Sequence, residues 1–297
     1  MSATIIDGKR IAELIKEKAI DILSMLAEEE LYPQLSVILV GNDPASQVYV
    51  RQKEKACKSI GLKSNIIRLP EDCTQNQLDN AIISQALDDN VVGIMMQLPL
   101  PKHLNAESAT GHIPYYKDVD GFDYINAGHL WTNGEAKYIA CTPAGIIFAL
   151  KESGVEFAGK HAVIVGRSNT VGKPLAALLL KENATVTVCH SKTTNLGEFT
   201  KQADILIAAA GKPKMITSDM VKDGAIVVDV GISRIDGKLV GDVDFDEVKE
   251  IASMITPVPG GVGPLTVAML MLNAARGAWI QRDYLRLAKA NERRACG

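Results

Sequence analysis

The chain has 297 residues, and 47% of them are hydrophobic, which is enough for the cores of two domains rather than one. Its formal net charge of -3 argues against a nucleic-acid-binding surface, and no apolar run approaches the roughly 18 residues of a membrane span. The five cysteines are scattered and form no C-x-x-C pair, which indicates reduced thiols rather than a disulfide framework or a zinc site.

The first part of the chain predicts helices and strands in alternation. Apolar residues recur at helical spacing over residues 9–29, and residues 35–40 form an apolar run typical of a buried strand. A turn follows, in which we expect Asp43 to cap a helix and Pro44 to be its first residue. This helix is expected to end at about residue 59.

The same alternation continues to residue 98. The sequence predicts a strand at 64–69, a helix from the capping box Thr74-x-x-Gln77 to about residue 87, and a strand at 91–98. Strands that alternate with helices predict a parallel sheet. Residues 102–142 show no clear element, so this segment is either functional or holds structure that its pattern does not reveal.

The second half repeats the pattern. Thr142 and Pro143 predict the start of a helix to residue 152 that bridges two domains. The expected strands lie at residues 162–165, 185–188, 205–210, 225–230 and 254–255. An apolar helix is predicted at 266–280, and the basic, amphipathic residues 281–297 are expected to pack back on the first domain.

Residues 161–174 have the pattern of a nucleotide-binding turn. A buried strand ends at Gly166, and a polar turn leads to Pro174, which suits the first turn of a helix. The unpaired N–H groups at such a helix start can bind a phosphate. The glycine fingerprint is incomplete, because Ser168 stands at its second position and Gly172 comes one residue late. A turn without a ligand explains this stretch almost as well.

The end of the next strand favours NADP over NAD. NAD-binding proteins place an acid near this point, about 20 residues after the glycines, for the ribose hydroxyls. Here Ser191 and Lys192 occupy the position, and Arg167 lies in the first turn. A hydroxyl and two cations suit the 2′-phosphate of NADP.

One helix carries a stripe of residues that could take part in chemistry. Ser46, Tyr49 and Lys53 fall on one face of the helix that follows the first strand. A desolvated lysine there can act as a base, and a tyrosine can stack on a flat ligand. The spacing by itself fits an ordinary surface helix better, since neighbouring residues are also basic.

Three other segments could bind a ligand or be purely structural. Gln97 ends a strand before Pro99, where it could hold a polar partner or simply belong to a chain break. Asp118 and Asp120 lie in a loop, where a carboxylate can bind an amino-heterocycle but more commonly forms an Asx turn. The three glycines of residues 256–264 allow close approach to a ligand, or belong to a rigid connector.

Together these segments resemble the methylenetetrahydrofolate dehydrogenase/cyclohydrolase family from end to end. The resemblance is carried by residues 46–53 (SQVYVRQK), 97–101 (QLPLP), 117–122 (KDVDGF), 165–168 (VGRS) and 257–264 (PVPGGVGP). Five motifs in the same order make it specific. The family's own nucleotide turn has the form G-R-S with a late glycine, so the resemblance also accounts for the incomplete fingerprint.

The resemblance implies an α/β fold with two domains around a cleft. The expected boundaries are 1–141 plus 281–297 for a folate-binding catalytic domain and 142–280 for a Rossmann-like NADP-binding domain. The implied partners are tetrahydrofolate derivatives and a second copy of the chain in a homodimer, with no nucleic acid and no membrane. The first residues lack the pattern of a secretory or transit peptide, so we expect a cytoplasmic protein, with mitochondria still open.

The resemblance also implies roles for individual residues. Lys53 would be the catalytic lysine, Gln97 its hydrogen-bond partner, Tyr49 a stacking partner of the folate, and Asp120 the anchor of the pterin. The other implied folate-binding residues are Ser46, Leu98, Pro259, Gly260, Gly261, Val262 and Gly263. The implied cofactor-binding residues are Gly166, Arg167, Ser168, Ser191 and, near the nicotinamide half, Ile232. No metal is expected.

The implied activity is a pair of reactions in one-carbon metabolism and purine biosynthesis. NADP oxidises 5,10-methylenetetrahydrofolate to the methenyl form, and water then opens that ring to give 10-formyltetrahydrofolate. Two alternatives remain at this point: another NADP-dependent α/β dehydrogenase, or a dinucleotide-sensing module without catalysis. The second gives no reason for the stripe of Tyr49 and Lys53.

Overall fold

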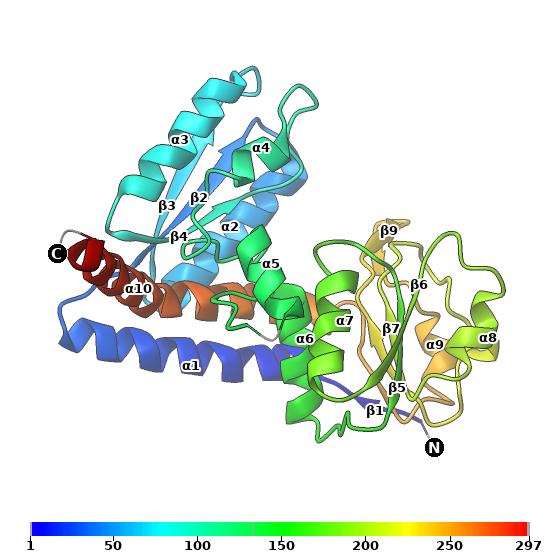
Figure 1. The fold of residues 1–297 in the computed structure, drawn as a ribbon. Helices are drawn as coiled ribbons and strands as arrows, with labels where there is room; N and C mark the ends of the chain where they lie inside the picture. Colours follow the sequence, from blue (N-terminus) through cyan, green and yellow to red (C-terminus); the bar gives the residue numbers. More distant parts are fainter. Residues whose placement is uncertain (1, 133, 296–297) are drawn as a thin grey trace. The chain divides into compact units, whose positions relative to one another are not determined.

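The computed structural model describes residues 2–132 and 134–295, which form two compact units. Unit 1 contains residues 2–14, 130–132 and 140–269, and unit 2 contains residues 15–129, 134–139 and 270–295. Each unit is built on a parallel sheet (Figure 1). In the described ranges, no helix combines the length and the apolar character that a membrane crossing requires.

Unit 2 is built on a three-stranded parallel sheet in the order β3-β2-β4. The strands are β2 (Gln34–Val40), β3 (Lys63–Leu69) and β4 (Val91–Met96), and every residue of β4 is buried. Helices α2 (Pro44–Ser59) and α3 (Gln75–Leu87) pack against these strands (Figure 1). These elements and the parallel pairing confirm the expected alternation.

The two helix starts predicted in this unit are present. Asp43 caps α2 by accepting a hydrogen bond of 2.7 Å from the backbone N–H of Ser46, and Pro44 is the first helical residue. Thr74 and Gln77 form the capping box of α3. Because α2 directly follows the carboxyl end of β2, its first turns are fixed at that edge of the sheet.

Residues 102–142, for which the sequence predicts no clear element, contain two short helices. These are α4 (Ala106–Thr110), capped by Asn105, and α5 (Tyr124–Trp131). Between them, a single parallel bridge joins Asp118 to Ile94 of β4. The segment therefore passes beside the sheet of unit 2 without forming a full strand.

Unit 1 contains a six-stranded sheet in the order β1-β11-β8-β7-β5-β6, and all of its strand pairs are parallel. Its strands are β1 (Thr4–Ile5), β5 (His161–Val165), β6 (Thr185–Cys189), β7 (Ile205–Ala208), β8 (Ile226–Asp229) and β11 (Met254–Ile255). Buried residues of β5, β7, β8 and β11 share one hydrophobic cluster. The order is that of a doubly wound sheet, as a Rossmann-like domain requires.

Short elements complete unit 1. They are α6 (Cys141–Glu152), α7 (Gly172–Lys181), α8 (Leu196–Thr200), the 3-10 turn η1 (Ser218–Met220), the hairpin of β9 (Ser233–Ile235) and β10 (Lys238–Val240), and α9 (Phe245–Val248). Figure 1 shows α6 and α7 on one side of the sheet and α8 and α9 on the other. Helices on both faces explain why the central strands β5, β7 and β8 are largely apolar and buried.

The start of the chain lies in a different unit from the one expected. Residues 2–14 belong to unit 1, because Thr4 and Ile5 pair in register with Met254 and Ile255. A strand of two residues is too short to show a period, so the pattern of the sequence does not reveal this pairing. Residues 270–280, expected with the NADP domain, belong to unit 2.

Two long helices each begin in unit 1 and continue into unit 2. These are α1 (Gly8–Glu28) and α10 (Val262–Ala295). The sequence predicts a helix at 266–280 and a separate amphipathic tail, whereas the structure has one continuous helix to Ala295. This helix begins at Val262 and has Pro264 in its first turn. Proline is tolerated there, because the N–H that it lacks would be unpaired at a helix start in any case.

One predicted cap is wrong. The helix expected to begin at Thr142 begins at Cys141, after Ala140, and has no side-chain cap. The Thr142 hydroxyl instead lies 2.8 Å from the hydroxyl of Thr266 on α10. This contact joins two elements of unit 1 that the sequence pattern could not pair.

Candidate functional site

The carboxyl edge of the small sheet brings Lys53 and Gln97 together. Lys53 lies on the third turn of α2, and Gln97 directly follows β4. The Lys53 Nζ donates a hydrogen bond of 2.9 Å to Gln97 Oε1. The Gln97 amide nitrogen donates 2.7 Å to the carbonyl oxygen of Leu98, so the orientation of the amide group is fixed. Gln97 is buried, whereas Leu98 is exposed.

Asp120 is a carboxylate that interacts electrostatically with this lysine. Burial raises the pKa of Asp120, and the positive charge of Lys53 acts in the opposite direction. Lys53, Gln97 and Asp120 therefore form one polar cluster, assembled from α2, the end of β4 and the loop before α5. We call these three residues the lysine cluster.

The segment that carries Asp120 is held by a buried lysine. Lys117 Nζ donates hydrogen bonds of 2.8 Å to the carbonyl oxygens of Ala86 and Asp88, at the carboxyl end of α3. Burial lowers the pKa of Lys117, although the two nearby carboxylates of Asp88 and Asp89 oppose this. This cation satisfies carbonyl groups that a helix end leaves unpaired.

Asp118 is structural, in keeping with the Asx turn that is the common role of such a loop acid. Its buried carboxylate accepts hydrogen bonds from the backbone N–H groups of Gly121 (3.2 Å) and Asp123 (2.8 Å) and from the Asn126 side chain (3.3 Å). Burial raises the pKa of Asp118 to about 7, and these N–H donors oppose the rise. Asp118 and Lys117 thus fix the backbone on the amino-terminal side of Asp120.

Ser46 and Tyr49 complete the stripe on α2, in different environments. Ser46 is buried beside the cap of the helix, whereas the side chain of Tyr49 is 50% exposed. Tyr49 lies one turn before Lys53, so its ring is available to a flat ligand next to the lysine cluster. The stripe is not the plain surface helix that spacing alone favours, since Ser46 is buried and Lys53 is hydrogen-bonded into the cluster.

In unit 1, the turn after β5 has the close packing of a nucleotide-binding turn. Gly166 has a φ of 139°, and a side chain there would collide with the carbonyl oxygen of Ala209. A side chain at Gly172 would collide with the carbonyl oxygen of Gly166. The Ser168 hydroxyl accepts a hydrogen bond of 3.1 Å from the backbone N–H of Val171, which orders the start of α7.

Arg167 and Ser191 lie at the carboxyl ends of neighbouring strands. Val165 of β5 and Cys189 of β6 are register partners, and each candidate follows its strand by two residues. Both are exposed. This edge has no carboxylate between residues 189 and 193, so it can accept a phosphate without charge repulsion.

Ile232 and the glycine-rich loop lie at the same edge of the large sheet. Ile232 follows β8 and is 52% exposed, and residues 257–261 follow β11. The Cδ1 atom of Ile232 would be 3.8 Å from a Cβ at Gly263. The structure thus places Gly263 near Ile232, and Pro259 to Val262 directly precede Gly263 in unit 1.

Sequence reasoning missed a pair of buried acids at this edge, Asp229 and Asp242. The signal was present, because Asp229 ends an apolar strand at a position where the pattern favours an apolar residue. Both side chains are buried. Within residues 2–132 and 134–295, three or more His, Cys, Asp or Glu side chains nowhere gather as metal ligands.

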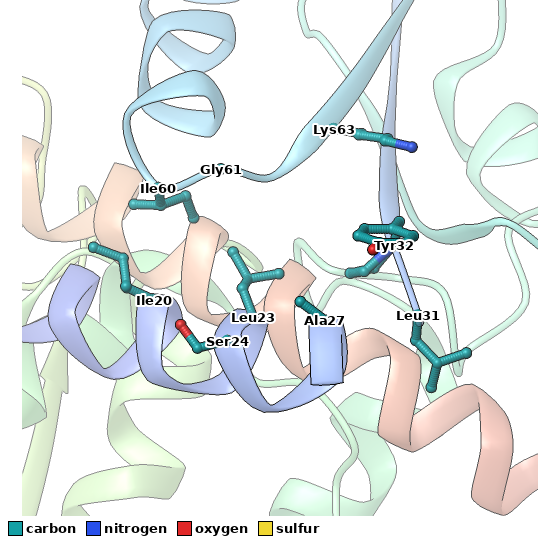
Figure 2. A pocket seen from close by; sticks show the side chains of 10 residues that line it. Ile20, Leu23, Ser24, Ala27, Leu31, Tyr32, Ile60, Gly61 and Lys63 are labelled. Atoms are coloured by element: carbon teal, nitrogen blue, oxygen red, sulfur yellow. The ribbon is translucent and has the colours of Figure 1, made fainter. Parts of the chain in front are cut away.

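A separate hollow of about 240 Å³ in unit 2 contains no candidate residue. Its lining residues come from the end of α1, from Leu31, Tyr32 and Pro33 before β2, and from the turn between α2 and β3 (Figure 2). It therefore lies at the amino ends of β2 and β3. Since ligands of parallel sheets bind at the carboxyl ends, the lysine cluster is the better candidate.

Comparison with family models gives two adjacent matches. The model for the catalytic domain of tetrahydrofolate dehydrogenase/cyclohydrolase matches residues 6–120. The model for the NAD(P)-binding domain of the same family matches residues 140–282. The first range contains the lysine cluster, and the second contains the nucleotide turn and Ile232.

Individual relatives agree with these matches. The bifunctional protein FolD of Exiguobacterium sibiricum is 53% identical over 276 residues, which cover 93% of this chain and 99% of that protein. FolD from Halalkalibacterium halodurans is 50% identical, and the aligned region covers 94% of this chain and 99% of that protein. The chain thus matches these relatives over nearly their full length.

Solved structures show the same fold. The FolD methylenetetrahydrofolate dehydrogenase/cyclohydrolase from Campylobacter jejuni superposes with a TM-score of 0.92 at 48% identity, covering 94% of this chain and 99% of that one. The Trypanosoma brucei enzyme, described in complex with NADP and an inhibitor, superposes with a TM-score of 0.89 at 36% identity. The match covers 96% of this chain and 99% of that one.

Proposed function

The chain belongs to the tetrahydrofolate dehydrogenase/cyclohydrolase family, and we propose which of its residues carry each of the two reactions. It is a bifunctional, NADP-dependent enzyme that acts on tetrahydrofolate derivatives. Unit 2, with the lysine cluster, is the folate-binding catalytic unit. Unit 1, with the nucleotide turn, is the NADP-binding unit.

The carboxyl edge of the large sheet fits the cofactor. Gly166 and Gly172 keep side chains away from the turn after β5, and Ser168 orders the N-terminus of α7. Arg167 and Ser191 are exposed at the ends of neighbouring strands, where they would hold the 2′-phosphate. When bound, NADP supplies the hydride acceptor for the first reaction.

The first reaction needs little acid–base chemistry from the protein. When 5,10-methylenetetrahydrofolate loses hydride, the two nitrogen atoms next to the carbon stabilise the resulting methenyl cation. Alignment is the main contribution, and correct placement of reactants is a large effect in catalysis. Asp120 would anchor the pterin by accepting its paired N–H groups, and Tyr49 would stack on the ring.

The second reaction does need a group that moves protons. Water adds to the carbon of the methenyl cation and loses a proton, and the carbon–nitrogen bond then breaks as that nitrogen is protonated. The products are 10-formyltetrahydrofolate and one net proton. Lys53 would hold and pass the proton at Nζ, and Gln97, which accepts the hydrogen bond from that atom, would set its direction.

The observation that carries this proposal is the lysine cluster, a buried amide and a carboxylate around one amine at the carboxyl edge of a sheet. A single assay tests it: protein, 5,10-methylenetetrahydrofolate and NADP are mixed, and the absorbance of NADPH and of the methenyl product is followed. A dehydrogenase for another substrate, or a dinucleotide sensor, would form no NADPH here. If NADPH forms but the methenyl absorbance does not fall, the methenyl ring is not hydrolysed, and this result would contradict the role proposed for Lys53.

Two further expectations are also part of this proposal. The family resemblance supports a homodimer, which sedimentation analysis of the purified chain would test. A cytoplasmic location is proposed on the same ground, and fractionation of cells that produce the protein would test it.

A further inference from the structure

Asp229 joins three segments at the carboxyl edge of the large sheet. Its Oδ1 accepts hydrogen bonds from the backbone N–H groups of Gly231 (3.0 Å) and Asp242 (2.9 Å), and its Oδ2 accepts from Val243 (3.0 Å). The backbone N–H of Asp229 donates 2.7 Å to the hydroxyl of Thr256, the first residue after β11. One side chain thus connects the segment that carries Ile232 to the segment after β10.

Asp242 extends the network to the end of β7. Its Oδ2 accepts hydrogen bonds from the backbone N–H groups of Ala210 (2.6 Å) and Gly211 (2.8 Å). Gly231 and Gly241 leave room for the two carboxylates, because a side chain at Gly231 would collide with Asp242 and one at Gly241 with Asp229. The backbone around both acids is therefore closely fitted to them.

The charge of this pair is not compensated by a cation within the described parts of the chain. All the hydrogen-bond donors to the two carboxylates are backbone N–H groups, and the fully buried Oδ1 of Asp242 has none. Burial raises the pKa of Asp229 to about 6, and the neighbouring Asp242 carboxylate adds to the rise. At neutral pH, Asp229 therefore places buried negative charge beneath the edge to which Ile232 belongs.

The two redox forms of a nicotinamide differ in charge at the ring. The oxidised ring carries a positive charge and the reduced ring is neutral, while the rest of the cofactor is the same. A fixed carboxylate in a site of low dielectric attracts a cation more strongly than it would in water. We propose that Asp229 and Asp242 are positioning residues that hold the Ile232 segment and make unit 1 prefer the oxidised cofactor over the reduced one. This inference rests on the proposed placement of NADP at this edge.

Binding titrations of the full chain test the inference without turnover. The dissociation constants of NADP+ and NADPH are measured at pH 7.5 for the wild type, Asp229→Asn and Asp242→Asn. We expect each substitution to weaken NADP+ binding at least about fivefold more than NADPH binding. Asp236→Asn is the matched control, because this exposed acid lies in the turn of the neighbouring β9–β10 hairpin. It should leave the ratio of the two constants unchanged.

The wild type provides a second measurement that does not depend on the variants folding. Asp242 adjoins Asp229, and the nearby Asp244 is paired with Lys214 at 3.3 Å. Lowering the pH from 7.5 to 5.5 protonates Asp229, so the preference for NADP+ should fall at least about twofold. The 2′-phosphate titrates too, but it is common to both cofactors and cancels in the ratio.

Each result has a distinct meaning. Equal weakening of NADP+ and NADPH in both variants, with a ratio that does not change with pH, would overturn the charge effect and leave a structural role alone. Failure of the wild type to bind either cofactor would instead contradict the proposed function of unit 1.

Discussion

Lys53 and Gln97 are 44 residues apart in the chain, yet the Nζ of one donates a 2.9 Å hydrogen bond to the Oε1 of the other. Parallel strands explain this contact. β2 and β4 are neighbouring parallel strands, so both end at the same edge of the sheet. The helix that follows β2 and the residue that follows β4 therefore meet at this carboxyl edge. The pairing gives the lysine a fixed acceptor before any substrate binds.

Substitution of Lys53 should separate the two activities. Lys53→Met keeps the length of the side chain but removes the amine, so cyclohydrolase activity should be nearly lost, because ring opening needs a proton carrier. Dehydrogenase activity should persist to a larger extent, because it depends on alignment. Following NADPH and methenyl absorbance in one cuvette would show the methenyl product accumulating.

Lys53→Arg is the matched control for charge. It keeps the cation but cannot give up a proton at neutral pH, so it should also fail in ring opening. Wild-type hydrolysis of methenyltetrahydrofolate by either variant would mean that the proton carrier lies elsewhere.

Asp120→Asn should weaken the binding of folate and leave the binding of NADP unchanged. The substitution keeps the shape of the side chain but replaces one acceptor oxygen with a donor, which cannot pair with the N–H groups of a pterin. A loss of tenfold or more is expected, since hydrogen bonds to charged groups contribute about 1.5–3 kcal/mol. Titration with a folate and with NADP measures both constants. Asp72→Asn changes an exposed acid in the same unit and is the control. An unchanged dissociation constant for folate in Asp120→Asn would contradict the role of Asp120 as the pterin anchor.

Arg167→Ala should weaken NADP much more than NAD. A charge-assisted contact to the 2′-phosphate predicts a loss of roughly tenfold to a hundredfold for NADP alone. Lys181→Ala, at the opposite end of α7, removes an exposed cation and should change neither constant. If NADP and NAD are weakened equally by Arg167→Ala, this side chain does not bind the 2′-phosphate.

The buried carboxyl of Asp118 should make stability depend on pH. Its pKa is about 7 in the folded protein and about 4 when unfolded, so the native state binds the extra proton between these values. Its contribution is therefore present at low pH and is lost as the pH rises toward 7. From pH 5 to pH 8 this loss is roughly 2–3 kcal/mol of unfolding free energy. Urea unfolding at the two pH values should show a larger difference for the wild type than for Asp118→Asn, and equal differences would contradict the assignment.

Much of the fold follows from local patterns in the sequence. Strands β2 and β4 of unit 2 are largely apolar runs, and strong signals lie next to the strands, such as Asp43 before Pro44 and the capping box of Thr74 and Gln77. These signals act over a few residues, so they can be read without knowing the rest of the structure. The site motifs at Lys53, Gln97 and Asp120 were equally visible, although only the parallel pairing shows that they meet.

The features that the sequence did not reveal depend on distant contacts. β1 is two residues long and exists because Thr4 and Ile5 pair with β11, about 250 positions later. The hydroxyl contact of Thr142 and Thr266 spans 124 residues. The buried pair of Asp229 and Asp242 is stable only where folded backbone offers its N–H groups, and no local pattern encodes that arrangement.

The way α10 completes unit 2 has a consequence for biosynthesis. Asn273 donates 2.9 Å to the carbonyl oxygen of Val119, Gln281 donates 2.9 Å to that of Asp89, and Gly277 packs against Val92 of β4. The ribosome makes these three residues more than 150 positions after the strands of that unit. A nascent chain that already contains β2, β3 and β4 therefore still exposes part of the surface of β4. The catalytic unit can close only after residue 281 has been translated, so its last folding step comes long after the synthesis of its own sheet.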